Sequence, residues 1–404
     1  MNGISASCSK NIIQGDEKHN MSVFNKKSLF TWVKLYESWF LAVILLCIWA
    51  GFYVYDLGRS EFVHEEGRRA LSAREMIQRD DFLIPSVLEK TYLNKPPGYP
   101  WLIMGLSLFT GGVGEWTVRL TSALGTAVTA LAIFLFARDL LSIRARFLAS
   151  AFFLVTLMSL EKGKLGEIEA VFTTLVWVAL HFAWYGFRSS KNWRWWFLSG
   201  LGLGAAMLVK GPPALLFYYG TLLCFCVQSH RFRWFFSWEH AIVFCVSCLI
   251  FMGWLLPAID NVGWVTLFQT GTQEMILRGQ SGIAVFFDEH SSLIVNSFVG
   301  MLPGSFFLLA YFWRHRWENA GEHGELRSFL FSLVLSSFFF FLFFPGARAR
   351  YLYPIAPAVA VLGAMVWERV DSHVALQRLS TVFTIILGGM GLLGFGTLYG
   401  LSAL

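Results

Sequence analysis

The feature that most constrains the fold is a series of apolar segments separated by short polar turns. Eleven of these segments are long enough, or nearly so, to cross a bilayer, which takes about 20 helical residues. They are residues 39–55, 120–137, 147–160, 170–187, 195–209, 212–228, 239–257, 291–313, 328–344, 351–367 and 380–401. With 56% hydrophobic and only 14% charged residues, the composition excludes a soluble or a disordered protein. The sequence therefore predicts an all-α, polytopic membrane protein.

The basic residues predict how the spans are oriented. Residues 1–37 are rich in lysine and lack an early apolar core, so they are interpreted as a cytoplasmic tail and not as a signal peptide. Alternating the spans from there puts five basic clusters on the cytoplasmic side, as the positive-inside rule requires. The clusters are Arg138/Arg144/Arg146, Arg188/Lys191/Arg194, His230/Arg231/Arg233, Arg314/Arg316/Arg327 and Arg369/Arg378.

The same alternation assigns the rest of the chain. Residues 38–404 form one transmembrane domain with two long outer loops, 56–98 and 258–290, and with no soluble C-terminal domain. Residues 99–113 are apolar, but counting them as a full crossing would reverse the next Arg-bearing loops. They are therefore predicted to form a re-entrant or interfacial helix, which gives about 11 to 13 helices in all. Because the basic residues follow topology and form no stripe, no nucleic-acid partner is expected.

The first outer loop carries an acidic pair, Glu65 and Glu66, at the start of a predicted amphipathic helix on the membrane surface. Its expected apolar face contains Ala70, Ala73, Met76 and Ile77, and its polar face contains Arg68, Ser72 and Glu75. Acids at a helix N-terminus are favoured by the helix dipole, which is a purely structural explanation. The functional alternative is that a carboxylate near the bilayer positions or deprotonates an acceptor.

Cations at outer span ends run against the usual charge bias and are therefore candidates for function. They are Lys95 before Pro96-Pro97, Lys210 before Gly211-Pro212-Pro213, and Arg348 and Arg350. Snorkelling of a long side chain is the structural alternative. Two acids, Glu167 and Glu169, fall on the same side by the topology. Cations that neutralise a leaving phosphate, beside carboxylates that manage a nucleophile, are what transfer from a lipid phosphate requires.

Several motifs resemble those of a known family. They are Glu65-Glu66 with Arg68 and Ala73-Arg74-Glu75-Met76; Asp81 to Pro85; Tyr92 with Lys95-Pro96-Pro97 and Trp101; Lys210 to Pro212; and Arg350-Tyr351 with Pro354 and Pro357. Together they resemble the bacterial GT-C glycosyltransferases, and more narrowly the aminoarabinose (lipid A) transferases and protein-mannosyltransferase-like enzymes, over roughly residues 40–360. The family usually has Asp where this chain has Glu65, and often Glu where it has Asn94.

The resemblance implies a GT-C fold and an integral membrane glycosyltransferase of the bacterial inner membrane. Its partners would be a polyprenyl-phosphate sugar donor, a periplasmic acceptor such as lipid A or another envelope glycolipid, and membrane lipids. The resemblance carries the roles of the family's two acids onto Glu65 and onto Glu169 or Glu167. The catalytic residues predicted from the sequence are Glu65, Glu66 and Glu169, and the predicted substrate-binding residues are Arg68, Tyr92, Lys95, Lys210, Arg348, Arg350 and Tyr351.

A divalent metal ion near Glu65, Glu167 and Glu169 is an option in this family and not a firm requirement. Two alternatives to the lipid A transferase remain open at this point: a protein O-mannosyltransferase-like enzyme, and a flippase or transporter of the lipid-linked sugar. Transporters usually have internal repeats and ionisable residues near the middle of their spans. This sequence shows no internal repeat and has few ionisable residues in mid-span.

Overall fold

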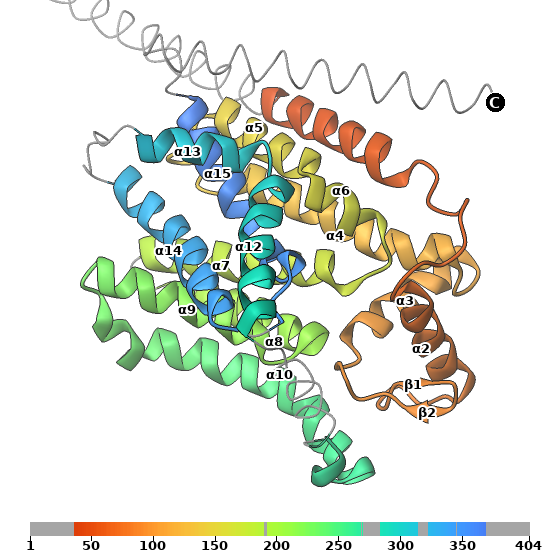
Figure 1. The fold of residues 1–404 in the computed structure, drawn as a ribbon. Coiled ribbons are helices and arrows are strands. Elements are labelled where there is room, and N and C mark those ends of the chain that lie inside the picture. The colour runs from red at the N-terminus through yellow and green to blue at the C-terminus, as the bar shows by residue number, and fades with distance from the viewer. Residues whose placement is uncertain are drawn as a thin grey trace, which may run out of the picture.

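The computed structural model describes residues 36–189, 192–267, 269, 283–313, 322–344 and 346–368. The predicted last span, 380–401, and residues 1–35 of the predicted tail lie outside these ranges. The described part is helical except for one short hairpin, which confirms the predicted all-α class (Figure 1).

The elements follow the predicted order of spans. The first helix covers Tyr36–Val54 and ends in the π-helix η1 (Ala50–Val54). The first outer segment contains α2 (Glu66–Gln78), β1 (Ser86–Val87), β2 (Lys90–Thr91) and α3 (Gly98–Thr110). The central part contains α4 (Glu115–Leu135), α5 (Ile143–Val155), α6 (Leu157–Lys164), α7 (Ile168–Arg188), α8 (Trp193–Lys210), α9 (Pro213–Gln228), η2 (Phe232–Phe236) and α10 (Trp238–Val262). The last part contains α12 (Ile283–Gly300), α13 (Gly304–Trp313), α14 (Glu322–Leu342), η3 (Ala349–Ile355) and α15 (Ala356–Trp367).

Three units, α4, α7 and η3–α15, are the most buried of the candidate spans. Their most apolar windows are 72%, 67% and 78% buried, compared with 11% for Tyr36–Val54 and 28% for α10. On α7, Phe172, Trp177 and Trp184 are completely or almost completely buried, and Trp177 packs on Phe136 with ring centroids 4.9 Å apart. Apolar residues that the protein does not cover must face lipid in a membrane, so Tyr36–Val54 and α10 lie at the periphery.

The number of spans is not confirmed. Among the described residues, six helices are long and apolar enough to cross a bilayer, or seven if the bent pair α5–α6 forms one span. The apolar helix α9 has only 16 residues, fewer than the roughly 20 that a straight crossing needs.

Three predicted boundaries need correction. The predicted span 147–160 crosses a 62° bend between α5 and α6, and the predicted span 291–313 is divided between α12 and α13, where Pro303 precedes the new helix. The predicted outer loop 258–290 is helical at both ends, because α10 continues to Val262 and α12 begins at Ile283. Hydropathy locates apolar runs, but it does not detect where a helix bends or extends into polar sequence.

The helix α3 behaves as a partial helix, in agreement with the prediction for residues 99–113. Its 13 residues extend about 20 Å at 1.5 Å per residue, which is too short for a bilayer core of about 30 Å. Its first residue, Gly98, lies against Leu208 at the end of α8, and Arg74 of α2 donates a hydrogen bond to the Val113 carbonyl just beyond its last turn at 3.0 Å. The start of α3 therefore rests on the end of α8, and the residues after its last turn are held by α2. We call the end of the bundle where this first outer segment lies the outer end.

The predicted faces of α2 are partly wrong. Ala70, Ala73 and Met76 are buried as expected, but Ile77 is 44% exposed. The buried face instead includes four polar or charged side chains: Glu66, Arg69, Ser72 and Glu75. Since Glu75 accepts hydrogen bonds from the Ser86 hydroxyl and the Glu89 backbone N–H, it holds the hairpin β1–β2 against α2. The helix therefore packs on protein through polar contacts and does not simply lie on the membrane surface.

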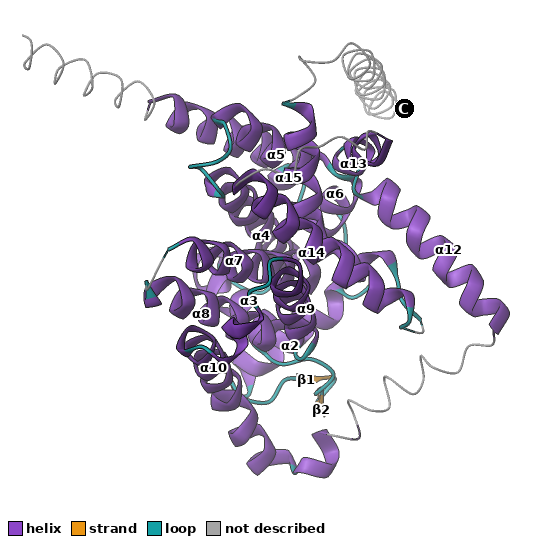
Figure 2. Cartoon of the chain, turned by 90° about the vertical axis from the view of Figure 1, so that its left-hand side faces the viewer, coloured by secondary structure: helices purple, strands orange, loops and turns teal. Residues whose placement is uncertain are grey.

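The first outer segment is also attached to α10. Figure 1 and Figure 2 both draw α2 and the hairpin in the lower part of the molecule, as they do α8 and α10. The Trp254 indole N–H of α10 donates a hydrogen bond to the Leu83 carbonyl at 3.1 Å. The outer segment therefore forms part of the packed structure.

Candidate active site

Side chains from five separate segments meet at the outer end of the bundle. Lys210 Nζ lies 3.5 Å from Glu169 Oε1. The charges of Arg350 and Arg69 also act on the Glu169 carboxylate, and the charge of Lys95 acts on Lys210. We call these five residues the Glu169 cluster. They come from α2, the loop after β2, the first turn of α7, the end of α8 and η3. The charges of three cations therefore act on one buried carboxylate, and the fourth, Lys95, acts on Lys210.

Local backbone features fix the two lysines of the Glu169 cluster. The helix α8 ends at Lys210 because Gly211 adopts φ +81°, a left-handed conformation that side chains disfavour. A Cβ atom at Gly98 would lie 2.6 Å from the Leu208 carbonyl oxygen, so only glycine permits this close approach. The turn that carries Lys95 therefore rests directly on the end of α8, and this contact brings the two lysines together.

Aromatic rings support the cations of the cluster. Lys210 Nζ lies 4.8 Å from the centroid of the Phe172 ring and 5.6 Å from that of Tyr351. The Arg350 guanidinium lies 5.7 Å from the Tyr351 centroid. A cation is attracted to the face of an aromatic ring at such distances. Tyr351, predicted to bind substrate, therefore contacts two of the cluster cations.

Glu65 lies at the edge of the cluster. Its side chain is 34% exposed and accepts a hydrogen bond from Arg68 at 2.9 Å, and its Oε2 lies 3.8 Å from Arg69 Nη2. Arg69 Nη1 donates to the Tyr92 hydroxyl at 3.3 Å, and both guanidinium groups lie 5.8 Å from the Tyr92 ring. The structure thus brings together three predicted site residues of the first outer loop, Glu65, Arg68 and Tyr92, with the neighbouring Arg69. Arg69 faces the cluster, and Arg68 is more exposed.

Arg348 lies apart from these contacts. It immediately precedes η3, its side chain is exposed, and within the described part of the chain no contact joins it to the Glu169 cluster. Its predicted role in substrate binding therefore has less geometric support than that of Arg350.

Glu66 has a very different environment from its neighbour Glu65. Its carboxylate is completely buried and accepts hydrogen bonds from the backbone N–H groups of Val63 at 2.9 Å and Gly166 at 2.7 Å. It also accepts from Arg119 Nε at 2.9 Å and Nη2 at 2.8 Å. Burial raises the pKa of the Glu66 carboxyl, but the hydrogen bonds from Arg119 and the two backbone groups outweigh burial and leave the pKa below its ordinary value. Glu66 is therefore a fully satisfied anion.

Arg119 completes this second site, which we call the Glu66–Arg119 pair. Its Nη1 donates to the carbonyls of Leu57 at 2.7 Å and Ser60 at 2.9 Å, and its Nη2 donates to the Glu61 carbonyl at 2.8 Å. Residues 57–66, the first turns of α4 and Gly166 are thereby joined at one point. Because Gly166 directly precedes Glu167, the pair connects the two acid-bearing segments.

Three of these basic residues were not predicted from the sequence: Arg69, Arg119 and Lys162. For Arg119 a signal was present, because it is an arginine at the outer end of a span, which the charge bias disfavours. Lys162 Nζ lies 3.1 Å from Glu167 Oε2 and 2.8 Å from Glu161 Oε1. Nothing in the one-dimensional pattern identifies Glu167 as its partner.

The acids do not assemble into a metal site. Over the residues described, no group of three or more His, Cys, Asp or Glu side chains is arranged to hold a metal ion. Each of the three acids considered as ligands faces its own cation: Glu65 faces Arg68, Glu167 faces Lys162 and Glu169 faces Lys210. This donor set does not fit a shared divalent ion.

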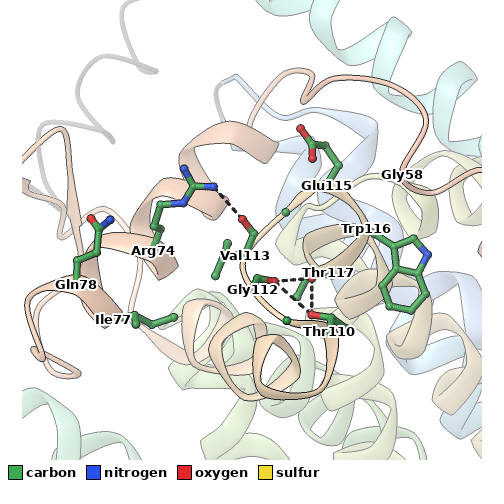
Figure 3. A pocket seen from close by; sticks show the side chains of 12 residues that line it. Gly58, Arg74, Ile77, Gln78, Thr110, Gly112, Val113, Glu115, Trp116 and Thr117 are labelled. Carbon is green, nitrogen blue, oxygen red and sulfur yellow. Dashed lines mark hydrogen bonds between the residues drawn. The ribbon is translucent and has the colours of Figure 1, made fainter.

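A separate open groove of about 700 Å³ lies between α2 and the turn from α3 to α4 (Figure 3). Arg74 and Gln78 project toward it from α2, and Trp116 lines it from α4. The hydroxyls of Thr110 and Thr117, 2.6 Å apart, brace its floor. None of the predicted site residues lines this groove, so it is distinct from the Glu169 cluster.

Fold and cluster together define a class: a polytopic, all-helical membrane protein with a cationic site at one end of its bundle. Residues 94–256 match the family described as dolichyl-phosphate-mannose-protein mannosyltransferase. The chain is 24% identical over 375 residues to the undecaprenyl phosphate-alpha-4-amino-4-deoxy-L-arabinose arabinosyl transferase of Edwardsiella ictaluri, covering 89% of this chain and 65% of that protein. It is 28% identical over 378 residues to the enzyme of the same name from Pseudomonas paraeruginosa, covering 89% and 64%.

A solved structure shows the same fold. ArnT from Cupriavidus metallidurans bound to undecaprenyl phosphate superposes with a TM-score of 0.68 at 18% identity, covering 88% of this chain and 64% of that one. The resemblance to the aminoarabinose transferases and protein-mannosyltransferase-like proteins, predicted from the loop motifs, is therefore confirmed in sequence and in fold. The chain spans about two thirds of the length of these relatives, slightly less in each case.

Proposed function

We propose that this protein is a membrane glycosyltransferase that transfers a sugar from a polyprenyl-phosphate donor to an acceptor at the outer face of the bacterial inner membrane. The observation that carries the proposal is the Glu169 cluster, in which three cations act on one buried carboxylate and a fourth cation acts on Lys210. Such an excess of positive charge in a poorly solvated place is costly unless an anion binds there. A lipid phosphate at the membrane boundary supplies that anion.

The chemistry follows from the charges. The donor phosphate lies among Lys95, Lys210 and Arg350, which stabilise the negative charge that grows as the bond from phosphate oxygen to the anomeric carbon breaks. The acceptor oxygen attacks the anomeric carbon as the polyprenyl phosphate leaves. Glu65, the accessible acid at the edge of the cluster, positions that acceptor or takes its proton. Glu169 holds the cations in place from below, and Tyr351 orients two of them.

The Glu66–Arg119 pair has a positioning role in this proposal. The Glu66 carboxylate already accepts four hydrogen bonds, so it has little capacity left for substrate. By fixing the first turn of α2, it holds the adjacent Glu65 at the cluster. Arg68 and Tyr92 complete the substrate-binding edge, and Arg348 is the outermost candidate.

The names of the relatives support a specific donor. Two of them are named as undecaprenyl phosphate-aminoarabinose transferases, which supports undecaprenyl phosphate as the lipid carrier and an aminopentose as the sugar. The lipid A phosphate as the acceptor rests on the resemblance of the loop motifs to the lipid A transferases. In this proposal residues 1–37 are cytoplasmic, residues 38–404 form the transmembrane domain, and the loops 56–98 and 258–290 lie in the periplasm. The match of residues 94–256 to the protein-mannosyltransferase family favours a second acceptor class, a protein hydroxyl.

The test is a transfer assay with the purified full chain. The protein is mixed with a labelled polyprenyl-phosphate sugar and either lipid A or an acceptor polypeptide. Formation of labelled acceptor is expected, and Glu65→Gln or Lys95→Ala should abolish it without loss of folded protein. If labelled donor only moves between leaflets unchanged, the protein is a flippase. Near-normal turnover in both variants would refute the proposed site.

A further inference from the structure

We infer that Arg69 is an additional phosphate-binding residue of this site, using its buried Nε–H and guanidinium to contact the anionic oxygens of the polyprenyl-phosphate donor. This inference rests on the proposed function and names a residue that neither the loop motifs nor the topology singled out. It is carried by the burial, the contacts and the hydrogen-bonding capacity of one side chain.

The first observation is where Arg69 lies. It occupies the same face of α2 as Glu66, Ala73 and Met76, at the spacing of three to four residues that defines one side of a helix. Only 8% of its side chain is exposed, compared with 46% for Arg68 one position earlier. A guanidinium is almost never buried without a group to pair with. The buried Arg69 therefore needs a partner in the protein interior, whereas the more exposed Arg68 can be solvated.

The second observation is that the known partners of Arg69 do not use all of its donors. Its Nη1 donates to the Tyr92 hydroxyl at 3.3 Å, and its Nη2 lies 3.8 Å from Glu65 Oε2, which is an ion pair too long for a good hydrogen bond. Its Nε is buried and has no hydrogen-bond partner. Buried donors on charged groups nearly always form a hydrogen bond, so we expect the Nε–H of Arg69 to donate to an acceptor that is not part of the chain.

The third observation is the direction of its charge. Arg69 acts on the Glu169 carboxylate together with Lys210 and Arg350. Arg350 Nε is likewise buried and without a hydrogen-bond partner. The charges of two guanidinium groups from distant parts of the chain thus act on one acid, and each group has an unused buried N–H. A phosphate, with several acceptor oxygens and a preference for the planar fork of arginine, satisfies both at once.

A water molecule could also accept a hydrogen bond from one such N–H. The test must therefore distinguish binding of the phosphate group from binding of the lipid chain. Binding of undecaprenyl phosphate to the purified full chain is compared with binding of the uncharged polyprenol of the same length, for wild type, Arg69→Met and Arg69→Lys. Arg74→Met is the matched control, because Arg74 lies on the same helix, is exposed and contacts only the α3–α4 turn among its described hydrogen bonds.

The expected result is selective for charge. Arg69→Met should weaken binding of undecaprenyl phosphate by about 10- to 100-fold and leave binding of the polyprenol unchanged. Arg69→Lys, which restores the charge without the fork, should be intermediate, and it decides the matter if Arg69→Met does not fold. Arg74→Met should match wild type.

Two results would overturn the inference. One is wild-type affinity for the phosphate in both Arg69 variants. The other is an equal loss of phosphate and polyprenol binding, which would indicate a structural role. These outcomes are distinguishable from failure of the proposed function, because in that case the wild-type chain itself would neither bind the phosphate nor transfer sugar.

Discussion

The outer end of the bundle contains two buried charged sites that differ in how completely they are satisfied. In the Glu66–Arg119 pair, one acid meets one arginine, and the four hydrogen bonds to the acid and the three from the arginine to backbone carbonyls leave nothing unused. In the Glu169 cluster, the charges of three cations act on one acid, a fourth cation acts on Lys210, and two buried guanidinium Nε atoms have no partner.

The difference separates structure from function. A buried charge is tolerated when its own protein neutralises it and supplies its hydrogen bonds, so the Glu66–Arg119 pair is explained by the fold alone. An excess of buried positive charge is not explained by the fold, and it is expected where an anionic substrate completes the site. The sequence patterns single out Glu66 and Glu169 equally, and only the side chains around them in the structure distinguish the two acids.

The largest effect should come from breaking the satisfied pair. Glu66→Ala leaves the buried Arg119 without its counter-ion, and removal of one partner of a buried ion pair costs about 3–5 kcal/mol. We expect loss of folded protein or a strongly lowered unfolding temperature in detergent micelles. Glu61→Gln, on the same loop but exposed, is the control and should unfold like wild type. An unchanged unfolding temperature for Glu66→Ala would mean that the pair does not hold the loop.

The opposite pattern is expected in the Glu169 cluster. Lys210→Met removes a cation that would bind phosphate, while Arg69 and Arg350 still compensate Glu169. Sugar transfer should fall by about 100-fold or more, comparable to the loss of an electrostatic group at a developing charge, whereas the unfolding temperature should change by only a few degrees. Lys90→Met, an exposed lysine on β2, serves as the control for both measurements. Unfolding without loss of turnover would reverse the roles assigned to the two sites.

A smaller effect concerns pH. The pKa of Glu66 is lowered in the folded state, so its contribution to stability is fully present above the ordinary glutamate pKa of about 4.3 and is lost as the pH falls through the lower, folded value. Stability measured from pH 7 downward should therefore fall below about pH 4.3. Glu66→Gln, if it remains folded, should show a shallower fall over that window. Identical pH profiles would show that another group titrates there.

The smallest effect is expected at the exposed edge. The pair between Arg68 and Glu65 is 46% and 34% exposed, and such pairs contribute roughly 0–1 kcal/mol. Arg68→Ala should leave the unfolding temperature within a few degrees of wild type, whatever it does to substrate binding. A loss as large as that of Glu66→Ala would show that the first turn of α2 depends on this contact.

Much of the fold was predictable because the constraint on a membrane helix is local. Apolar runs identify the central helices α4 and α7 without knowledge of their neighbours. The bend between α5 and α6 and the division between α12 and α13 were not predictable from hydropathy, because apolar side chains continue across both breaks. The outward orientation of Ile77 on α2 depends on the polar contacts of Glu75 with the hairpin, which are tertiary.

The site was predictable in its location and only partly in its pairings. The topology alone brought Lys95, Glu169, Lys210 and Arg350 to one end, because their positions relative to span ends fix the side of the membrane. The distinction between Glu65 and Glu66 was not predictable, because it depends on a helix rotation of about 100° per residue that buries one and exposes the other. The same rotation separates Arg69 from Arg68.

The most direct measurement is an experimental structure of the full chain in a lipid nanodisc with undecaprenyl phosphate bound. We expect the phosphate within about 4 Å of Lys210 and Arg350, beside Glu169, with Arg69 as a further contact and the Glu66–Arg119 pair unchanged. A phosphate bound in the groove beside Arg74 and Trp116, with the Glu169 cluster closed on itself, would contradict the assignment of the cluster as the phosphate site.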